Sequence, residues 1–473
     1  MSGTFTAGEQ KTRPGSYFRY KNSGLPASVA VTNDVVACVV QSNWGPLGKV
    51  VEIEQDDHIF GSSGTAEIIN LIRQQGARCK VVRLGDGESG VAGTITLKDT
   101  TAEDAVDAVK LTAKYVGSRD IRVALRDSLS DSTKRELLVY DGTTFKKRIL
   151  FAKGNTGDGE PAALTAAVNA GNDWLTATKS ADGNKTLAAV SATALTGGAN
   201  PTITTTDYSA AFALIEAVQF NVICVDTEDV AVHALVDVFI DRIWDDGKLG
   251  LYVIGEPTSI PFDDRCENSA AYNDFKGHYL LNGYTDISGN LYEGYKAAAI
   301  IAGLIAATGN DQGITHAVMS RAKGVSEALT NSQIIKAINS GALIFTENAQ
   351  GQVQVEYGVN TLVTLGPDED AGWKKIRRVR TRIELINRID AQTEPLVGKV
   401  NNDPDGRSTF IATAQREINS MAAEGKLLTG GAIAIDPDNP PAGDSSWYVI
   451  AVDDIDSGEK FYFTYKFRFA PES

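Results

Sequence analysis

Apolar runs and segments with helical periodicity alternate along two stretches of the chain. The first stretch begins with the continuous apolar run Val35–Val40, which is typical of a strand buried on both faces. Thr65–Gln75 then places three isoleucines at helical spacing, and Gly76 fits the position after a helix end. Lys80–Leu84 predicts the next strand. This order of strand, helix and strand indicates an α/β unit.

The same order resumes near Asp207, whose carboxylate fits the N-cap of a helix. Thr227 fits the cap of a second helix, and Thr330 with Gln333 forms a capping box before a later one. The predicted helices are Tyr208–Phe220, a segment from Thr227 through Trp244, Leu291–Thr308 and Ser332–Asn339. The predicted strands are Val222–Val225 and Leu249–Ile254. The second stretch therefore reads as the other half of the same α/β domain.

The interval between the two stretches has a different composition. Val91–Pro201 is rich in Thr, Gly and Asp, and its short apolar pieces predict strands. These pieces are Thr94–Leu97, Ile121–Leu125 and Leu137–Tyr140. We therefore predict a mainly β domain over residues 91–201, inserted into a discontinuous α/β core domain formed by residues 31–90 and 202–345.

The rest of the chain, residues 346–473, predicts an α+β C-terminal domain. The expected elements are a hairpin of Ala342–Thr346 with Gln352–Tyr357, a helix over Ser408–Ala423, and two closing strands, Trp447–Val452 and Lys460–Phe469. The last strand alternates with a period of two, so its aromatic side chains share one face. They are Phe461, Phe463, Tyr465, Phe467 and Phe469.

Both ends of the chain predict extended arms. Residues 1–30 show no helical period, and Phe5–Ser28 mixes glycine, proline and basic residues with aromatic ones. An aromatic strand at one end and a polar arm at the other are prone to edge pairing unless they are paired or covered. Such termini can add strands to a neighbouring subunit's sheet or pair within their own subunit, and the residues alone leave both alternatives open.

Composition and charge narrow the class of protein. The chain has 473 residues, 42% of them hydrophobic and 22% charged, which is typical of a folded globular protein. The formal net charge of −15 argues against a nucleic-acid coat, because phosphate binding needs a positive surface. No apolar export signal is visible, and the apolar stretch Lys296–Thr308 is too short to span a membrane. Four widely spaced cysteines predict no disulfide or zinc site and a reducing cytoplasm.

Two short motifs resemble ligand-binding loops. Gly85–Gly90 matches G-x-G-x-x-G after a strand, but a strand rather than a helix is predicted to follow, which favours a hinge into the inserted domain over a dinucleotide site. Asn401–Gly406 resembles the start of a calcium loop, yet Ala412 stands where that loop needs glutamate. A polar turn entering a helix is the favoured interpretation, and the acidic run Asp453–Gly458 likewise reads as a hairpin loop.

Evidence for catalysis is absent from the sequence. The four histidines are scattered, and no nucleophile elbow, phosphate loop or zinc-protease motif occurs. A general base could still lie among the carboxylates, because spatial proximity is invisible in a sequence. We therefore predict no catalytic residue, no cofactor and no metal.

The strongest local charge anomaly is a run of basic residues between apolar ones. It consists of Lys374, Lys375, Arg377, Arg378, Arg380 and Arg382. From the residues alone, an exposed solvated face is the first interpretation, a contact with an acidic protein the second, and nucleic acid a distant third.

Several motifs, in this order and spacing, resemble the contractile tail sheath family of phages and phage-tail-like bacteriocins. The segments that carry the resemblance are Arg13–Tyr17, Leu195–Gly198, Gly358–Leu362, Trp373–Thr381 and Val397–Asn402. Gly358–Leu362 is similar to the family's G-x-N-T-L pattern, and Trp373–Thr381 to its W-x-x-I-R-x-x-R pattern. The set looks closest to prophage-type sheaths of Gram-positive bacteria.

The resemblance implies a structural subunit that stacks as hexameric rings around a tail tube and contracts to drive the tube through a cell envelope. It implies as partners further copies of the chain joined by strand exchange, the tube protein, and baseplate and tail terminator proteins, with no direct nucleic acid and no membrane insertion. Assembly would occur in the bacterial host cytoplasm, and the product would be a virion tail or a phage-tail-like particle. The rival functions are a cytoplasmic α/β enzyme with an inserted lid domain and another phage structural protein.

Two groups of site residues follow from the resemblance together with the terminal patterns. The expected intersubunit arm residues are Arg13, Pro14, Gly15, Tyr17, Phe461, Phe463, Tyr465 and Phe467. The expected contacts to the tube or a neighbour are Lys374, Lys375, Arg377, Arg378, Arg380 and Arg416. In a ring of acidic subunits, these local basic segments are also where we expect repulsion to be offset.

Overall fold

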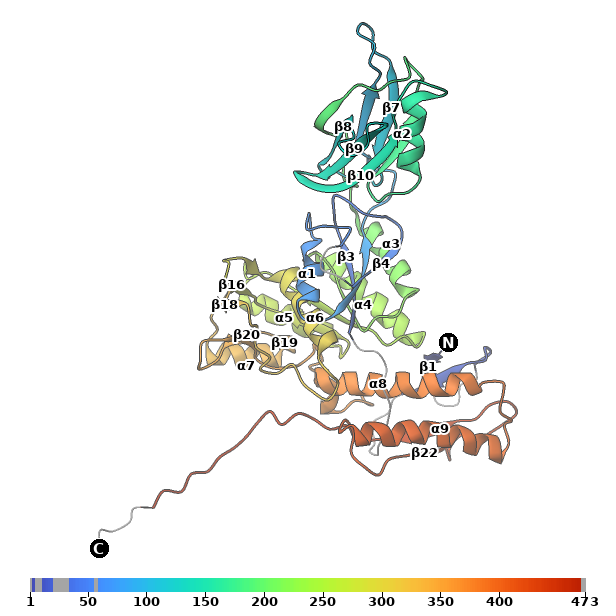
Figure 1. The fold of residues 1–473 in the computed structure, drawn as a ribbon. Helices are drawn as coiled ribbons and strands as arrows, with labels where there is room; N and C mark the ends of the chain where they lie inside the picture. Colours follow the sequence, from blue (N-terminus) through green and yellow to red (C-terminus); the bar gives the residue numbers. More distant parts are fainter. Residues whose placement is uncertain (1, 5–10, 20–33, 55–57, 469–473) are drawn as a thin grey trace. The chain divides into compact units, whose positions relative to one another are not determined.

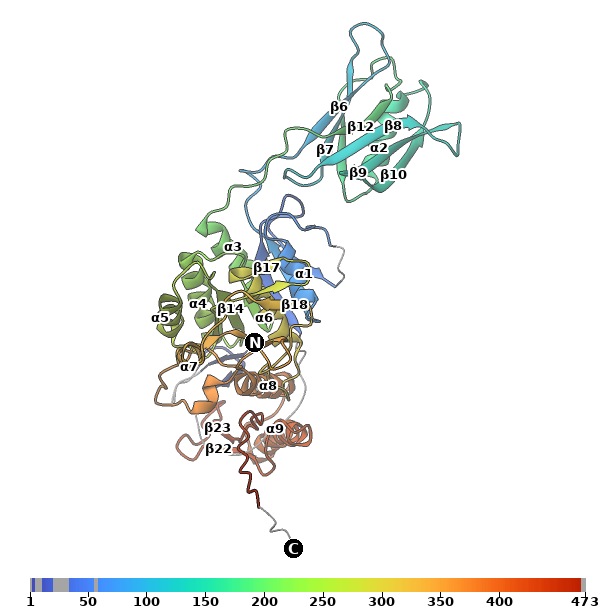
Figure 2. The same ribbon diagram turned by 90° about the vertical axis from the view of Figure 1, so that its left-hand side faces the viewer.

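The computed structural model describes residues 2–4, 11–19, 34–54 and 58–468. The chain divides into two compact units, each formed from separate segments (Figures 1 and 2). Unit 1 comprises Met1–Ala37, Leu71–Cys79 and Gln219–Ser473, and unit 2 comprises Cys38–Asn70 and Lys80–Val218.

The largest sheet has seven strands in the order β19-β15-β14-β13-β3-β5-β4. Their bounds are β3 Val35–Val40, β4 Val50–Ile53, β5 Arg78–Arg83, β13 Val222–Cys224, β14 Leu251–Gly255, β15 Gly277–Leu280 and β19 Ala342–Leu343. In unit 1, β13, β14, β15 and β19 pair in parallel, with Val222 opposite Leu251 and Tyr252 opposite Gly277. Every residue of β3, β13 and β14 is buried, which confirms the prediction made from the continuous apolar runs. Every residue of β15 is buried as well, but this strand was not predicted.

Helices connect the parallel strands, as the alternating pattern predicted. They are α1 Glu67–Arg73, α3 Thr205–Glu216, α4 Val230–Asp245, α5 Phe262–Tyr272, α6 Gly294–Ala307 and α7 Asn331–Asn339. The capping box of Thr330 and Gln333 at α7 is confirmed. Two predicted caps were wrong: α3 starts after Thr204, whose N–H donates to Asp207 at 2.7 Å, and α4 is capped by Asp229 instead of Thr227. In both cases another polar side chain within three residues of the predicted one takes the N-cap position.

Unit 2 contains two antiparallel sheets, of four strands in the order β10-β9-β8-β12 and of three in the order β11-β7-β6 (Figure 2). The bounds are β6 Thr94–Lys98, β7 Asp107–Ala113, β8 Ile121–Asp127, β9 Lys134–Asp141, β10 Thr144–Ala152, β11 Leu175–Lys179 and β12 Val190–Ala194. The three strands predicted for this interval are confirmed within β6, β8 and β9. The helix α2, Gly159–Asn169, was missed; it buries Leu164 and Val168 in the same core.

The chain after the large sheet contains two long helices. They are α8, Ile376–Thr393, and α9, Pro404–Ala423, which contact each other (Figure 1). The short helices η1 Ala371–Lys374 and η2 Glu394–Leu396 flank α8, and β22 Ala432–Ile435 pairs antiparallel with β23 Tyr448–Ala451. Asp403 caps α9 by accepting from the Gly406 N–H at 2.8 Å, which confirms the polar-turn interpretation of Asn401–Gly406.

Smaller sheets complete unit 1. The predicted hairpin is confirmed as β20 Phe345–Glu347 with β21 Val353–Val355, although Ala342 and Leu343 belong to the large sheet. A three-stranded sheet has the order β17-β16-β18, with bounds β16 Tyr284–Asp286, β17 Leu291–Tyr292 and β18 Ala322–Val325. Among the described residues, no helix combines the length and apolar character that crossing a membrane requires.

The two ends of the chain differ in structure. Near the start, β1 Ser2–Thr4 pairs in parallel with β2 Ser16–Phe18, and β2 contacts α8. At the other end the strand predicted over Trp447–Val452 is confirmed as β23, but none of residues 460–468 lies in a strand. The strand predicted over Lys460–Phe469 is therefore wrong for the single chain, because a strand needs a partner; Phe469 lies outside the described residues.

Candidate assembly site: the basic helix and the C-terminal segment

The basic cluster lies on η1 and the first turns of α8, and its side chains divide between two faces. Lys375, Arg378 and Arg382 follow a spacing of three and four residues, so they share one face, which we call the basic stripe. Arg377 and Arg380 lie beside this face, and both are buried, at 7% and 6% exposure. The sequence did not predict this helix, because its charges were read as an exposed surface.

The basic stripe binds the chain segment that follows β23. Asp454 accepts hydrogen bonds from Arg378 Nε at 2.8 Å and Nη2 at 2.6 Å, and from Arg382 Nη2 at 3.2 Å. Its side chain is only 6% exposed. Burial raises the pKa of Asp454, but the hydrogen bond from Arg378 and the charges of both arginines outweigh it, so the pKa lies below its usual range.

A second attachment lies five residues further on. Glu459 forms an ion pair with Lys375 and accepts a hydrogen bond from the Thr315 hydroxyl at 2.7 Å. Lys375 also lies 3.6 Å from Asp456, and its ammonium is 4.5 Å from the centre of the Tyr357 ring. Burial by itself lowers the pKa of Lys375. The hydrogen bonds and charges of these partners outweigh burial, so the pKa lies above its usual value. We call residues 454–459 the anchor segment.

The basic cluster is therefore occupied within its own chain, and its interpretation as an exposed solvated face is wrong. Arg377 donates to the Ser457 hydroxyl at 3.1 Å, and Arg380 donates to the backbone carbonyl of Thr308. Burial lowers the pKa of Arg380 to about 10. Lys374 donates to the backbone carbonyl of Val363. The interpretation of Asp453–Gly458 as a hairpin loop is also wrong. The only sequence signal for its pairing with the basic stripe was the opposite charge of the two segments.

Beyond the anchor segment the chain is exposed. Phe461, Phe463, Tyr465 and Phe467 are between 70% and 92% exposed, and residues 460–468, which we call the free segment, leave as extended chain (Figure 1). The rings of Phe463 and Tyr465 lie 6.4 Å apart, and those of Tyr465 and Phe467 lie 6.2 Å apart. Side chains two positions apart thus face the same way, as the period of two predicted.

The predicted residues of the N-terminal arm lie on and before β2. Arg13 and Pro14 are exposed, and the Tyr17 hydroxyl donates to the Arg13 carbonyl at 2.6 Å. The hydroxyls of Ser16 and Thr393, the last residue of α8, are 3.2 Å apart. Gly15 and Tyr17 are half-buried, so this arm is less exposed than the free segment.

The motif Gly358–Leu362 has a structural role. Asn360 is fully buried and donates to the backbone carbonyls of Phe275 at 3.1 Å and Trp373 at 2.6 Å, while its carbonyl accepts from the Leu362 N–H. One side chain thereby joins the β15 region to the start of α8.

The glycine motif Gly85–Gly90 leads into a strand. Gly85 has φ +105°, and a Cβ there would lie 2.4 Å from Pro201. Val91 then bridges Ala199, and β6 follows at Thr94, whereas a dinucleotide motif needs a helix at this point. The hinge interpretation fits this geometry better.

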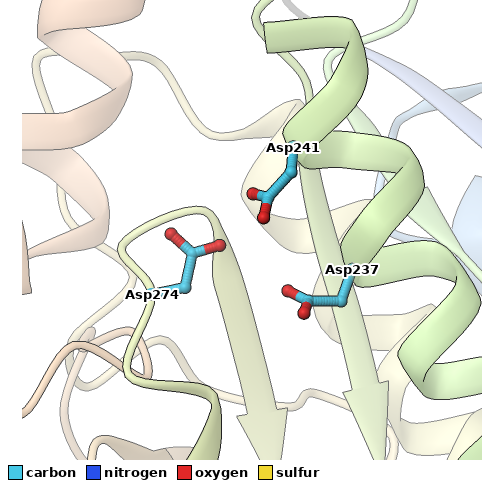
Figure 3. Close-up of side chains that lie close together, drawn as sticks. All are labelled: Asp237, Asp241 and Asp274. Carbon is cyan, nitrogen blue, oxygen red and sulfur yellow. The ribbon is translucent and has the colours of Figure 1, made fainter. Parts of the chain in front are cut away.

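One acidic cluster could be mistaken for a metal site. Asp237 and Asp241 on α4 and Asp274 before β15 point toward one another, with carboxylate oxygens within 4.8 Å (Figure 3). Lys276 already supplies a cation there, 2.9 Å from both Asp241 and Asp274. Burial raises the pKa of Asp237 and of Asp274. The lysine ammonium and the Tyr252 hydroxyl, which donates to Asp237 at 2.6 Å, give the cluster a structural role.

Comparison with known proteins identifies two domains by sequence. Residues 88–200 match the phage tail sheath protein beta-sandwich domain, and residues 202–361 match the phage tail sheath protein central domain. The phage-like element PBSX protein XkdK of Bacillus subtilis (strain 168) is 25% identical over 98% of each chain.

Solved structures agree in fold. The sheath tail protein from Desulfitobacterium hafniense superimposes with a TM-score of 0.71 at 20% identity, over 93% of this chain and 100% of that one. The anti-feeding prophage helical sheath in its contracted state gives 0.53 at 11% identity, over 97% and 99%. The β-sandwich predicted as an insertion and the mixed α/β content are thus those of a sheath protein. The two matched domains span more than half of the chain, which belongs to the phage tail sheath protein family, a family of structural proteins of contractile systems and not of enzymes.

Proposed function

We propose that this protein polymerises as stacked hexameric rings around a tail tube and contracts to drive the tube through a target cell envelope. The observation that carries the proposal is the free segment. It is an extended chain with one aromatic face, and it follows directly after the anchor segment, which is bound to α8. Large exposed aromatic side chains cost hydration free energy unless a partner covers them. Another copy of the same chain is a partner that is always present during polymerisation.

The receiving surface in our proposal is the sheet of β22 and β23. This sheet consists of two strands in the described part of the chain. The Ile433 N–H of β22 donates to the Gln415 side chain of α9 at 3.2 Å, so the incoming strand in our proposal pairs with the outer edge of β23. Val449 and Ile450 of β23 are 42% and 37% exposed and point to opposite faces of the sheet, so either face offers one apolar side chain to the incoming aromatic face. Main-chain hydrogen bonds of an added strand would keep subunits linked while side-chain contacts elsewhere change. The N-terminal arm, with Arg13, Pro14, Gly15 and Tyr17, would join neighbours in the same way.

Contraction in this proposal is a change between two packings of otherwise rigid subunits. Energy is stored as the free-energy difference between an extended and a contracted lattice, so no nucleotide is needed. The partners are further copies of this chain, the tail tube, and baseplate and tail terminator proteins. Assembly takes place in the cytoplasm of the bacterial host, and the sheath is released in a virion tail or a phage-tail-like particle.

Arg416 on α9 is the remaining candidate for contact with the tube. Its side chain is paired with Glu417 at 3.3 Å but is 67% exposed, and this leaves most of it accessible to a partner. Reversing the charge of Arg377, Arg378 and Arg380 would break internal contacts, so such a variant could not report on tube binding.

The test compares full-length protein with two variants of the free segment in sheath assembly followed by electron microscopy. Replacing Phe463, Tyr465 and Phe467 by serine removes the aromatic face, and replacing Tyr462 and Lys466 by serine alters the opposite face as a matched control. We expect striated cylinders from the full-length protein and the control, and none from the aromatic variant. Deleting residues from Lys460 onward, or residues 1–21, should also leave a folded chain that does not assemble. Normal cylinders from the deletion lacking Lys460 onward would refute exchange of the C-terminal strand.

A further inference from the structure

The C-terminal segment changes character at one residue. Up to Glu459 its side chains Asp454 and Glu459 are held by Lys375, Arg378 and Arg382, and from Lys460 onward every described residue is exposed. The charge-paired attachments therefore end at Glu459, and beyond it Lys460 lies near the Tyr357 ring, with its ammonium 5.6 Å from the ring centre. Holding the chain up to Glu459 needs a specific set of attachments, because an acidic loop of Gly, Ser and Asp has little tendency to order by itself.

The attachments come in two groups that lie five residues apart along the chain. Asp454 is bound by Arg378 and Arg382, and Glu459 is bound by Lys375 and Thr315. A single attachment fixes a position but lets the chain swivel about it. Two attachments, separated by up to about 17 Å of extended chain, fix a direction as well.

Neutral contacts support the same geometry. The Ile455 N–H donates to the Lys426 carbonyl at 3.0 Å, and the Leu428 N–H donates to the Asp453 carbonyl at 2.9 Å. Gly313 lies under Ser457, where a Cβ would be 3.1 Å from the hydroxyl oxygen. The anchor segment is thus seated against a surface that leaves little room for another path.

The basic stripe also connects the anchor segment to the rest of unit 1. Arg382 is shared between Asp454 and Asp370, and its guanidinium lies 4.4 Å from the centre of the Trp373 ring. Trp373 is buried and its ring lies 4.5 Å from that of Phe275. The anchor segment is therefore linked to α8 by charged hydrogen bonds and, through the Arg382, Trp373 and Phe275 side chains, to the chain before β15.

We propose that Lys375, Arg378 and Arg382 are positioning residues for strand exchange: they set the point and the direction at which the C-terminal strand leaves its subunit. This inference rests on the proposed exchange of that strand. If the anchor opened, residues 452–459 would join the tether and lengthen it by up to about 28 Å. The exchanged strand would then search a large volume before it met its neighbour, and its effective concentration would fall.

The first measurement reads the anchor in the unassembled protein. The endoprotease Asp-N cleaves before aspartate, and Asp453, Asp454 and Asp456 lie at or in the anchor segment. Lys375→Glu places a negative charge against Glu459 and Asp456, and we expect cleavage at these sites to become about tenfold faster, because a charge-assisted contact of this kind is worth about 1.5 kcal/mol or more. The double variant Lys375→Glu with Glu459→Lys restores an ion pair and should return the rate toward that of the unaltered protein. Lys110→Glu, an exposed reversal in unit 2, is the matched control.

The second measurement is assembly, followed by sedimentation and electron microscopy. We expect Lys375→Glu to raise the protein concentration needed for cylinders about tenfold, in proportion to the loss of the competent state, and the charge-swapped pair to lower it again. Asp454→Asn, which keeps the shape of the side chain, provides a second variant should Lys375→Glu fold poorly.

The outcomes separate this inference from the proposed function. If deletion from Lys460 onward abolishes cylinders while the anchor variants cleave faster yet assemble as the unaltered protein does, strand exchange stands and the anchor proposal is overturned. Unchanged Asp-N cleavage before Asp453 and Asp456 in both Lys375→Glu and Asp454→Asn would also overturn it. If the deletion still forms cylinders, the proposed exchange fails, and the positioning role fails with it.

Discussion

Arg388 offers the sharpest test of how α9 is held to α8. Its guanidinium is 1% exposed and lies 2.5 Å from Glu384, and it forms two hydrogen bonds of 2.9 Å to Glu424, which follows α9. Lys426 closes the network at 2.8 Å from Glu384 and 2.7 Å from Glu424. The surrounding apolar cluster is small, and so the network carries much of the specificity of the helix pair.

The perturbation is Arg388→Met, which keeps most of the side-chain volume and removes the charge. Glu384 would stay buried with Lys426 and the Asn310 amide, which donates at 2.7 Å, as its remaining partners. Removing one member of a buried ion pair costs about 3–5 kcal/mol. Because Lys426 still offsets part of the charge and Glu424 is one third exposed, we expect the lower end, about 3 kcal/mol.

Hydrogen exchange of the α9 amides measures this cost locally, without requiring the whole chain to unfold in one step. A loss of 3 kcal/mol corresponds to exchange that is about 100-fold faster in α9. Ala412→Ser, at an exposed position of the same helix, should change exchange by less than about threefold. The double variant Glu384→Gln with Arg388→Met should recover part of the loss, because the buried charge is gone. Exchange of α9 within threefold of the unaltered protein in Arg388→Met would refute the reasoning.

Two further predictions concern buried polar groups in unit 1. Asn360→Ala leaves two backbone carbonyls and one N–H without their partner, so we expect the free energy of unfolding to fall by about 2–4 kcal/mol in urea titration; a loss below about 0.5 kcal/mol would contradict the role assigned to this side chain. Burial lowers the pKa of His278 to about 4, against about 6.5 in the unfolded chain, so the unfolded chain binds the extra proton and stability falls by about 3 kcal/mol as the pH drops from about 6.5 to 4. His278→Gln should flatten that dependence in thermal unfolding, whereas the exposed control His316→Gln should not, and equal slopes for both variants would rule out His278 as the cause.

Local patterns in the sequence predicted several strands and several helices of the sheath fold. Val35–Val40 and Val222–Val225 could be read because a strand buried on both faces must be apolar throughout, whatever lies beside it. The helix α8 could not be read in this way, since its buried face carries Arg377, Arg380 and Arg388. The sequence of such a helix resembles that of an exposed helix unless the acidic groups that neutralise its arginines are known. One of these groups, Asp454, lies 76 residues away from Arg378 along the chain, so the local pattern does not reveal it.

The candidate site was predicted in part. The aromatic alternation of Phe463, Tyr465 and Phe467 was correct, because it depends only on neighbours two positions apart. The residues that hold the anchor segment were not predicted, because Glu459 is paired with Lys375 and Thr315, which lie 84 and 144 residues away along the chain. Sequence spacing carries no information on such pairs, and only the opposite charges hinted at them.

The use of the basic residues changes how acidic copies of this chain can pack together. We expected the cluster at Lys374–Arg382 to offset repulsion between neighbours, yet its charges are taken up by Asp370, Asp454 and Glu459 of the same chain. These basic residues are therefore not available to neutralise a neighbouring copy, and each copy keeps its net charge of −15. Cohesion of a sheath would then come from main-chain hydrogen bonds and aromatic burial, which salt does not weaken, while the repulsion between copies is screened by it. The partly buried pairs of the anchor segment are screened less than exposed charges, so ionic strength should favour assembly before it opens the anchor.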